Sequence, residues 1–165
     1  DIEKTENVDI LGDGRKLPLM NSSISLIVSQ AVLEHTPHTS INIQEFERVL
    51  KPNGHLYLEV PFMQTYHAHP HDYFRFTHSG LKNILENFDI VEEGIAVGPG
   101  SALALNLRIF LSTLFSFGNR RLFVGMTLVF GWLTFPLKFF DFFMESNSLS
   151  YHSASGIYVL ARKKN

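Results

Sequence analysis

The amino-acid sequence predicts an α/β fold in which helices lie on the faces of a mostly parallel β-sheet. Short apolar runs rich in β-branched residues alternate with segments whose apolar residues recur at helical spacing. Gly, Pro and Asn residues separate these segments as turn signals. The 165 residues fit one domain and are enough to bury a sizeable core.

Two segments carry the clearest strand signals. Residues 24–28 form a short β-branched run, and residues 55–62 form a strand that ends at Pro61. Three further strands are expected at 8–11, 88–97 and 156–161.

Residues 40–50 are the clearest predicted helix, with Ser40 as its cap and apolar residues at helical spacing on one side. The residues from Lys51 to Gly54 are expected to end this helix and turn the chain, because Asn53 tolerates the left-handed backbone region. Two more helical segments are expected, at 30–35 and from Thr77 or Ser79 to about Asn87.

The composition excludes several classes of protein. The net charge of −2 argues against a nucleic-acid-binding domain, because domains that work through phosphate contacts are usually clearly basic. The absence of cysteine excludes a disulfide framework and a thiolate metal site, and it fits a cytoplasmic protein. With 45% hydrophobic and 18% charged residues, the chain is not expected to be disordered.

Ligands of parallel sheets bind at the carboxyl ends of the strands, here the loops at 12–18, 29–36 and 62–76. The first loop reads Gly-Asp-Gly-Arg-Lys-Leu-Pro, the second begins Ser-Gln-Ala-Val-Leu-Glu-His, and Glu-Arg-Val-Leu-Lys-Pro-Asn-Gly follows at 47–54. In this order and spacing the motifs resemble the class I S-adenosylmethionine-dependent methyltransferases. The resemblance is strongest to the small-molecule, type 11-like branch, which includes the ubiquinone and menaquinone methyltransferases.

The stretch from His67 to Thr77 resembles the segment after the fifth strand in one subgroup of that branch. The resemblance implies a Rossmann-like methyltransferase sheet that is truncated at its N-terminus, since the first strand and its glycine-rich loop would precede Asp1. Residues 1–100 and 150–165 would form a partial methyltransferase domain, and residues 101–149 an inserted apolar helical hairpin. In family order, the third to seventh strands would lie at 8–11, 24–29, 55–61, 88–97 and, antiparallel to the others, 156–162.

The chain departs from the family pattern at two positions. Ser25 stands where the family usually has Asp, which puts a local hydrogen bond in doubt but not the strand. Asn53 stands where Gly is usual, and Asn is the next best residue for a left-handed turn.

The resemblance implies five residues that bind S-adenosylmethionine. Asp1 would accept both ribose hydroxyls, with an exposed terminal Asp as an equal alternative. Asp13 would contact the adenine amino group, and Gly14 would allow close backbone approach; the alternative is an Asp that bonds its own turn. Ser29 and Gln30 would lie beside the methionine and sulfonium parts, or would only add polarity to the loop.

Alternating histidines mark the loop at 62–76. In an extended segment His67, His69 and His71 point the same way, so three imidazoles could converge on a metal ion. Their spacing is unlike that of helical zinc pairs, and Pro70 perturbs the backbone, so no metal site is predicted.

The same loop is expected to face the substrate, next to the transferred methyl group. His67 or His71 would act as general base for a substrate hydroxyl, because imidazole titrates near neutral pH. Asp72 would orient that base or pair with Arg75. A structural loop pinned by Asp72 and Arg75 over packed aromatic rings is an equal alternative. The substrate-side candidates are His35, His69, Tyr73 and Arg75.

His35 directly follows Glu34, and adjacent residues cannot share one helical face. One of the two would face the site, or both would form a buried structural pair.

Phenylalanine is concentrated in one segment, with ten of the fifteen between Phe110 and Phe143. Arg108 is the only charged residue in 101–117, and residues 122–137 carry no charge. With a turn at 118–121 between these arms, residues 101–145 are predicted to form a helical hairpin that is apolar on nearly all sides.

Each arm approaches the roughly 20 residues that span a bilayer. A full span would carry Arg120 and Arg121 across the membrane, against the positive-inside tendency. A re-entrant or interfacial hairpin avoids this, with Arg108, Arg120, Arg121 and Lys138 reaching anionic headgroups. The alternative is a soluble lid or a dimer interface, since large apolar patches also mark protein contacts.

These features predict a methyltransferase at the cytoplasmic face of a membrane that uses S-adenosylmethionine to methylate a small or lipid-linked acceptor. The chain alone is expected to bind the cofactor poorly and to be inactive, because the glycine-rich loop lies outside it. A non-catalytic membrane- or partner-binding module that retains the methyltransferase fold is the alternative. A nicotinamide-dependent oxidoreductase on a similar sheet is a third reading, although nothing in the chain resembles its catalytic residues.

Overall fold

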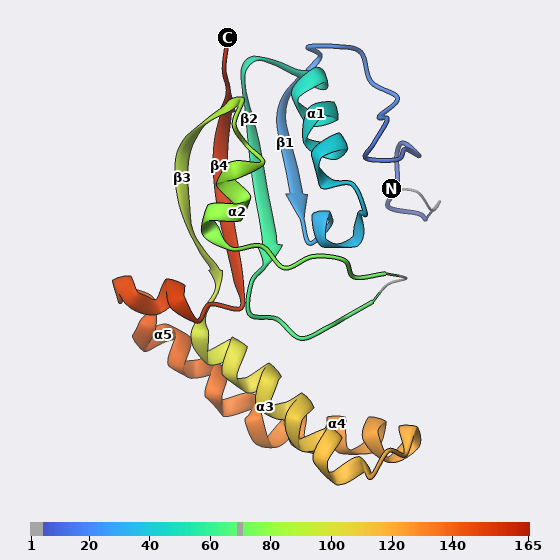
Figure 1. Ribbon diagram of the computed structural model, residues 1–165, viewed down its shortest axis with the longest axis vertical. Coiled ribbons are helices and arrows are strands. Elements are labelled where there is room, and N and C mark those ends of the chain that lie inside the picture. The colour runs from blue at the N-terminus through green and yellow to red at the C-terminus, as the bar shows by residue number, and fades with distance from the viewer. Residues whose placement is uncertain (1–4, 69–70) are drawn as a thin grey trace. The chain divides into compact units, whose positions relative to one another are not determined.

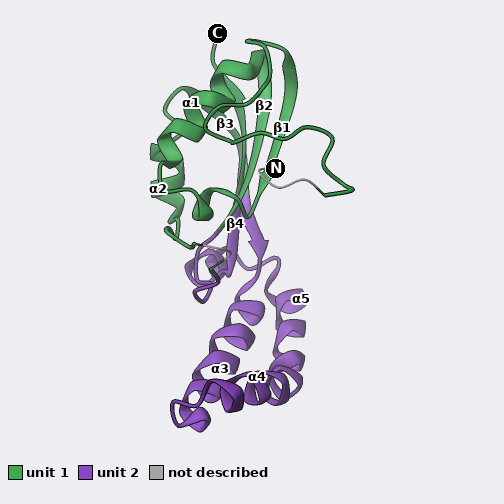
Figure 2. Ribbon diagram, turned by 90° about the vertical axis from the view of Figure 1, so that its right-hand side faces the viewer, with its two compact units in different colours: residues 1–60, 68–93, 158–165 green, residues 61–67, 94–157 purple. Residues whose placement is uncertain are grey.

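The computed structural model describes residues 5–68 and 71–165. The chain divides into two compact units, coloured separately in Figure 2. The first comprises residues 1–60, 68–93 and 158–165, and the second comprises residues 61–67 and 94–157. These boundaries follow the packing of the chain, whereas the division into a partial methyltransferase domain and a hairpin at 101–149 stays a prediction.

A four-stranded sheet confirms the predicted α/β fold. Its strands are β1 (Ile24–Gln30), β2 (Leu50–Pro61), β3 (Phe88–Val97) and β4 (Gly156–Lys163), in the spatial order β1-β2-β4-β3. Strands β1 and β2 are parallel, and β4 runs opposite to its neighbours (Figure 1). The last strand of the chain is therefore inserted between β2 and β3.

Strand β2 begins directly after the first helix, where the sequence predicted a turn. Leu50 pairs with Ile24, whereas Leu26 pairs with His55, so the residues between Leu50 and His55 bulge out of the ladder. Asn53 has φ +61° at this bulge, which agrees with the left-handed conformation expected of it. The turn signal was therefore correct, but the pairing starts before it.

Helices α1 (Thr39–Val49) and α2 (His78–Asn83) lie on the same face of the sheet (Figures 1 and 2). Residues that alternate along β2 point into this core, because successive strand residues face opposite sides. The opposite face is more open, with Leu26 and Val28 of β1 about half exposed. The main core residues are Leu33, Ile43, Phe46, Val49, Leu56, Leu58, Val60, Leu81, Leu85, Ile157 and Val159.

Three predicted details of the first unit are wrong. Residues 8–11 are not a strand, since they pair with no other strand among the described residues. Helix α1 begins one residue earlier than predicted, with His38 rather than Ser40 at its N-cap and no side-chain capping bond. Helix α2 ends at Asn83, four residues early, although Thr77 caps it as predicted by accepting from the Gly80 amide at 3.0 Å.

The predicted helical hairpin is confirmed in the second unit by α3 (Pro99–Ser116) and α4 (Arg120–Thr134). Gly118 supplies the positive φ that the turn requires, and the Asn119 side chain accepts from the first amides of α4. Arg120 and Arg121 therefore start the second helix and are not in the turn. Three short segments follow, η2 (Phe135–Phe139), α5 (Phe140–Met144) and η3 (Ser148–His152).

The carboxylate of Asp141 holds α5 against the start of α3. It accepts hydrogen bonds from the Gly100 amide at 2.6 Å and from the amide and hydroxyl of Ser101. A negative charge at a helix N-terminus also interacts favourably with the helix dipole. A side chain at Gly98 or Gly100 would collide with α5, which explains glycine at both positions.

The hairpin buries small residues and exposes large apolar ones, which is the reverse of the packing in a soluble core. The buried residues of α3 and α4 are small, and include Ala102, Ala104, Ser112, Ser116 and Thr134. Their hydroxyls donate to backbone carbonyls three or four residues earlier in the same helix. The large apolar side chains point outward, and Trp132 is 83% exposed.

In the first unit, an ion pair fastens the loop at 12–21 to α1. The Glu45 carboxylate accepts from the Arg48 guanidinium at 2.7 Å and from the Leu17 amide at 2.6 Å. Arg48 also donates to the Leu17 carbonyl and to the Asn21 side chain. The pKa of Glu45 lies below its ordinary value of 4.5, mainly because the guanidinium donates to the charged carboxylate.

Replacing the Glu45 carboxylate by an amide is expected to weaken this attachment at neutral pH. The Glu45→Gln substitution should lower the free energy of unfolding by about 1–2 kcal/mol, measured by urea denaturation. A depressed folded-state pKa gives stability that is present above the unfolded pKa and is lost as pH falls through the folded pKa. The difference between the two proteins should therefore shrink on acidification, and a difference that persists in strong acid would contradict this account.

Candidate functional site

The loop at 12–18 was predicted to approach the adenine of a cofactor. Both Asp13 carboxylate oxygens accept from the Arg15 guanidinium, and Oδ1 also accepts from the Arg15 amide at 2.9 Å. These bonds lower the pKa of Asp13. The structure thus shows the local-turn alternative, and the adenine contact stays a prediction.

Gly14 and Asn42 lie against each other beside this turn. A Cβ at Gly14 would sit 2.6 Å from Asn42 Nδ2, so the Asn42 side chain would have to shift to admit one. Asn42 is fully buried on α1, and among residues 5–68 and 71–165 neither its amide nitrogen nor its carbonyl oxygen has a hydrogen-bond partner. Because an unsatisfied buried amide costs about 1–3 kcal/mol, this pair is unusual for a purely structural position.

Sequence reasoning missed Asn42. The available signal was its spacing, because it precedes Phe46 by four residues and Val49 by seven and so belongs to the apolar stripe of α1. A polar residue in such a stripe needs a partner, which the described part of the chain does not supply.

The carboxyl end of β1 carries the other predicted cofactor residues. Ser29 is 7% exposed, and no described residue forms a hydrogen bond with its hydroxyl oxygen. Gln30 donates to Glu59 of the parallel neighbour β2 at 2.9 Å. Ala31 then takes φ +50°, which turns the chain away from the sheet. Parallel pairing has thus brought the ends of both strands together, as predicted.

A polar cluster that the sequence did not reveal crosses the sheet from Glu59. Tyr57 stacks on Tyr158 with ring centroids 5.6 Å apart, and the Tyr158 hydroxyl donates to Glu92. Burial, together with the charges of Glu59 and Glu92, raises the pKa of Tyr57. The hydrogen bond to Glu92 raises the pKa of Tyr158. Both phenols therefore stay protonated well above neutral pH.

The segment η1 (Leu33–His35) anchors the loop that follows β2. Glu34 is fully buried, and its carbonyl accepts from the Tyr73 amide at 2.7 Å. His35 Nδ1 lies 2.6 Å from the His71 carbonyl oxygen, and its Nε2 lies 3.9 Å from the Glu34 carboxylate. Both residues thus contact the loop, but only Glu34 is buried, since the His35 side chain is 22% exposed. That one of them faces the substrate stays a prediction.

Asp72 pairs with Arg75, one of the two partners that the sequence allowed. The guanidinium donates to both carboxylate oxygens, at 2.5 and 2.6 Å, and the Asp72 side chain is 1% exposed. The aromatic rings beside this pair are only partly packed as predicted, since Phe76 is buried but Tyr73 and Phe74 remain exposed. The structure gives Asp72 the role of holding the loop.

Four predicted site residues remain, and only His67 and His71 lie in the described part of the chain. His67 belongs to the second unit, where its Nδ1 lies 3.0 Å from the Thr65 carbonyl oxygen. His71 belongs to the first unit, and its ring contacts that of Tyr73. Asp1 and His69 lie outside the described residues, so the ribose contact and the three-histidine arrangement stay predictions.

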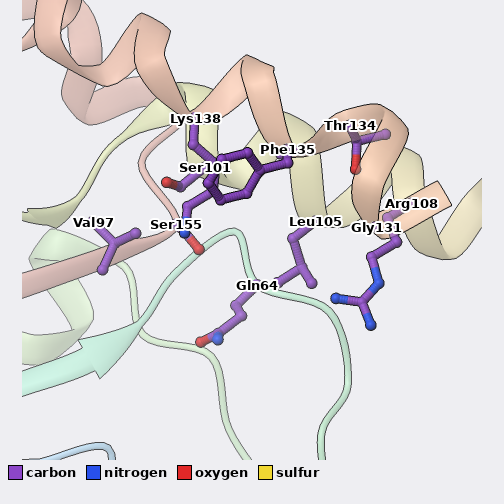
Figure 3. A pocket seen from close by; sticks show the side chains of 11 residues that line it. Gln64, Val97, Ser101, Leu105, Arg108, Gly131, Thr134, Phe135, Lys138 and Ser155 are labelled. Carbon is purple, nitrogen blue, oxygen red and sulfur yellow. The ribbon is translucent and has the colours of Figure 1, made fainter. Parts of the chain in front are cut away.

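Two cavities are lined by described residues of the second unit. One, of about 430 Å³, is mainly apolar and lies between α3 and α5. The other, of about 290 Å³, is lined by residues of α3, α4 and η2 together with Gln64, Val97 and Ser155 (Figure 3).

Comparison with known proteins shows which known fold this geometry shares. Residues 2–58 match the family model of a methyltransferase domain. The chain has the class I methyltransferase fold. No curated protein sequence matches it significantly.

Solved structures share this fold at low sequence identity. A Haloferax volcanii protein described as a methyltransferase, solved with a methyltransferase activator, is 16% identical, with a TM-score of 0.56. The cyclase SpnF is also 16% identical, with a TM-score of 0.55. Phosphoethanolamine N-methyltransferase 2 of Haemonchus contortus, in complex with S-adenosyl-L-methionine, is 14% identical, with a TM-score of 0.53. Each match covers 94% of this chain, but only 60%, 55% and 36% of the respective proteins.

The strand assignment implied by the methyltransferase resemblance agrees with this sheet for β1 to β4. The cyclase shows that the fold also serves other chemistry, so reaction type has to be argued from the site.

The buried pair of Asp72 and Arg75 should matter more to stability than a surface pair does. Asp72→Asn is expected to lower the free energy of unfolding by about 2–3 kcal/mol, since it leaves a partly buried guanidinium without its counter-charge. Lys82→Gln, which removes the exposed Lys82–Glu93 pair, should cost less than about 1 kcal/mol. Equal losses in urea denaturation would contradict the structural role given to Asp72.

Proposed function

We propose that this chain is part of a methyltransferase that uses S-adenosylmethionine to methylate a small or lipid-linked acceptor at a membrane surface. The buried, unpartnered amide of Asn42 against Gly14, within the segment that matches the methyltransferase family model, carries the proposal. The chain spans 55% and 60% of the length of two proteins that share its fold. The activity of a whole methyltransferase is therefore part of this proposal.

The described residues suit an adenosine-containing cofactor. The Asn42 amide nitrogen and carbonyl oxygen have no hydrogen-bond partner among the described residues, and the amide lies against Gly14 in the loop at 12–18. Ser29 adds an unpartnered hydroxyl at the end of β1. Asp13 and Gln30 already have internal partners, so the proposal assigns them supporting roles.

The chemistry asks little of the protein beyond positioning. S-adenosylmethionine supplies an activated methyl group on a sulfonium, so holding the acceptor in line provides much of the acceleration. His67 or His71 would remove the proton from an acceptor hydroxyl, as proposed from the sequence. Asp72 and Arg75 would keep the loop of His71 in place through their ion pair.

Inverted packing of the hairpin supports a membrane location. The segment Arg120–Met144 is long and apolar enough to cross a membrane, and an 18-residue stretch within it has a mean hydropathy of 1.6 with 6% of its residues buried. Small residues between the helices with large apolar residues outside are typical of helices packed in lipid. The hydroxyls of Ser112 and Thr134 donate to backbone carbonyls of their own helices and so need no water as a partner, which also suits an apolar surrounding. An interfacial hairpin is therefore proposed, with a soluble lid or dimer interface as the alternative.

Binding of S-adenosylhomocysteine, the product of methyl transfer, tests the cofactor site even at low affinity. In a ¹⁵N NMR titration of the full chain, the amide signals of Gly14, Ser29 and Asn42 are expected to shift first. Asn42→Leu should stabilise the free protein by about 1–3 kcal/mol, because it removes an unsatisfied buried amide, and should abolish those shifts.

Asn83→Leu is the matched control, since Asn83 is exposed on α2 and should change neither property. Unchanged signals at all three positions in the presence of the ligand would refute the cofactor site. Retained membrane binding in that case would support the non-catalytic module.

Flotation with phospholipid vesicles tests the hairpin. The chain should float with the vesicles, and the fluorescence of Trp132 should shift to shorter wavelength as its ring leaves water. Leu128→Glu with Leu133→Glu should weaken binding roughly tenfold or more without loss of folding, because both side chains are exposed. Leu149→Glu, outside the hairpin, is the control. A stable dimer in solution without vesicle binding would instead support the protein interface.

A further inference from the structure

The cavity of about 290 Å³ in the second unit combines cationic and apolar walls (Figure 3). Arg108 comes from α3 and Lys138 from η2, while Gln64 adds an amide and Leu105 and Phe135 add apolar surface. No carboxylate is among the lining residues. A pocket with two positive charges and no negative one favours an anionic ligand.

Arg108 is held in place but lacks a partner. Within the described part of the chain its buried Nε makes no hydrogen bond, which is costly for a guanidinium. Gly131 of α4 lies directly beside it, because a Cβ there would be 3.5 Å from Nε and 3.6 Å from Cζ. The guanidinium therefore packs against α4 at Gly131, where a Cβ would make only ordinary van der Waals contact with it.

Neither cation is neutralised by the protein. Among the ion pairs of the described residues, none includes Arg108 or Lys138. The nearby Asp141 carboxylate is occupied by the start of α3, where it accepts from Gly100 and Ser101. Lys138 Nζ lies 5.8 Å from the centroid of the Phe135 ring, a cation–π contact that leaves its donors available.

We propose that this cavity binds the phosphate group of an anionic membrane lipid. A guanidinium together with an ammonium is a suitable donor set for phosphate oxygens. A lipid also carries acyl chains, and the exposed apolar side chains of the same hairpin would contact them. That the ligand is a lipid depends on the membrane location proposed above. That the ligand carries a phosphate depends only on the residues of the cavity, because a soluble phosphate ester presents the same group.

Vesicles of matched surface charge separate phosphate recognition from general attraction to an anionic surface. The full chain is floated with phosphatidylcholine vesicles that contain phosphatidic acid or, at equal charge, oleic acid. We expect about tenfold tighter binding with phosphatidic acid. Arg108→Gln with Lys138→Gln should abolish this preference, and Arg108→Lys should reduce it because the planar donor fork is lost.

The matched control is Arg120→Gln with Arg121→Gln, which removes two cations from the opposite end of α4. It should weaken binding to both anionic vesicles equally, by about fivefold per charge, and keep the preference for phosphatidic acid. Circular dichroism of each variant establishes that the helices remain folded. Equal effects of the two double substitutions on the preference would overturn the phosphate site.

Titration calorimetry with glycerol 3-phosphate distinguishes the sources. If the chain floats with neutral vesicles but shows no preference for phosphatidic acid, the membrane location stands and the phosphate site is wrong. If the chain fails to float but binds glycerol 3-phosphate through Arg108 and Lys138, the phosphate site stands and the lipid source is wrong. If it neither floats nor binds the ester, both are wrong.

Discussion

Parallel pairing of β1 with β2 is the constraint on which the first unit depends. Two parallel strands need a crossover connection, and α1 provides it while burying its apolar stripe against the sheet. The same pairing places the ends of both strands at one edge, where Gln30 meets Glu59. The Glu45–Arg48 pair then fastens the loop of Asp13 and Gly14 to the crossover helix. The candidate cofactor residues are thus positioned by elements that the sheet requires for its own stability.

The two units differ in which side chains they bury. In the first unit large apolar side chains are inside, and the few buried polar groups stand out, Asn42 above all. In the hairpin small residues are inside, and each buried hydroxyl is satisfied by its own helix. Arg108 is the exception there, as Asn42 is in the sheet unit. Asn42 packs against Gly14, and Arg108 lines the cationic cavity.

Prediction from the sequence was reliable where a local signal coincided with a long-range requirement. The helix over α1 and the strands β1 to β4 were found because their apolar periodicity reflects burial. The segment at 8–11 has the same local character, but a strand exists only through its partner, and the described residues provide none. Likewise, Lys51 to Gly54 carry a genuine turn signal, yet the ladder starts at Leu50 because β1 is available to pair with it.

Residue types and their spacing determined the α/β class, the methyltransferase resemblance and the apolar hairpin, since each depends on patterns along the chain. Only the tertiary structure decided which polar side chains find partners. Asp72 pairs with Arg75, Asp13 with Arg15, and Gln30 with Glu59, whereas Asn42 and Arg108 keep buried groups without partners. Hydrogen bonding and burial depend on distances between residues that are far apart in the chain, as for Gln30 and Glu59, and a sequence pattern does not contain those distances.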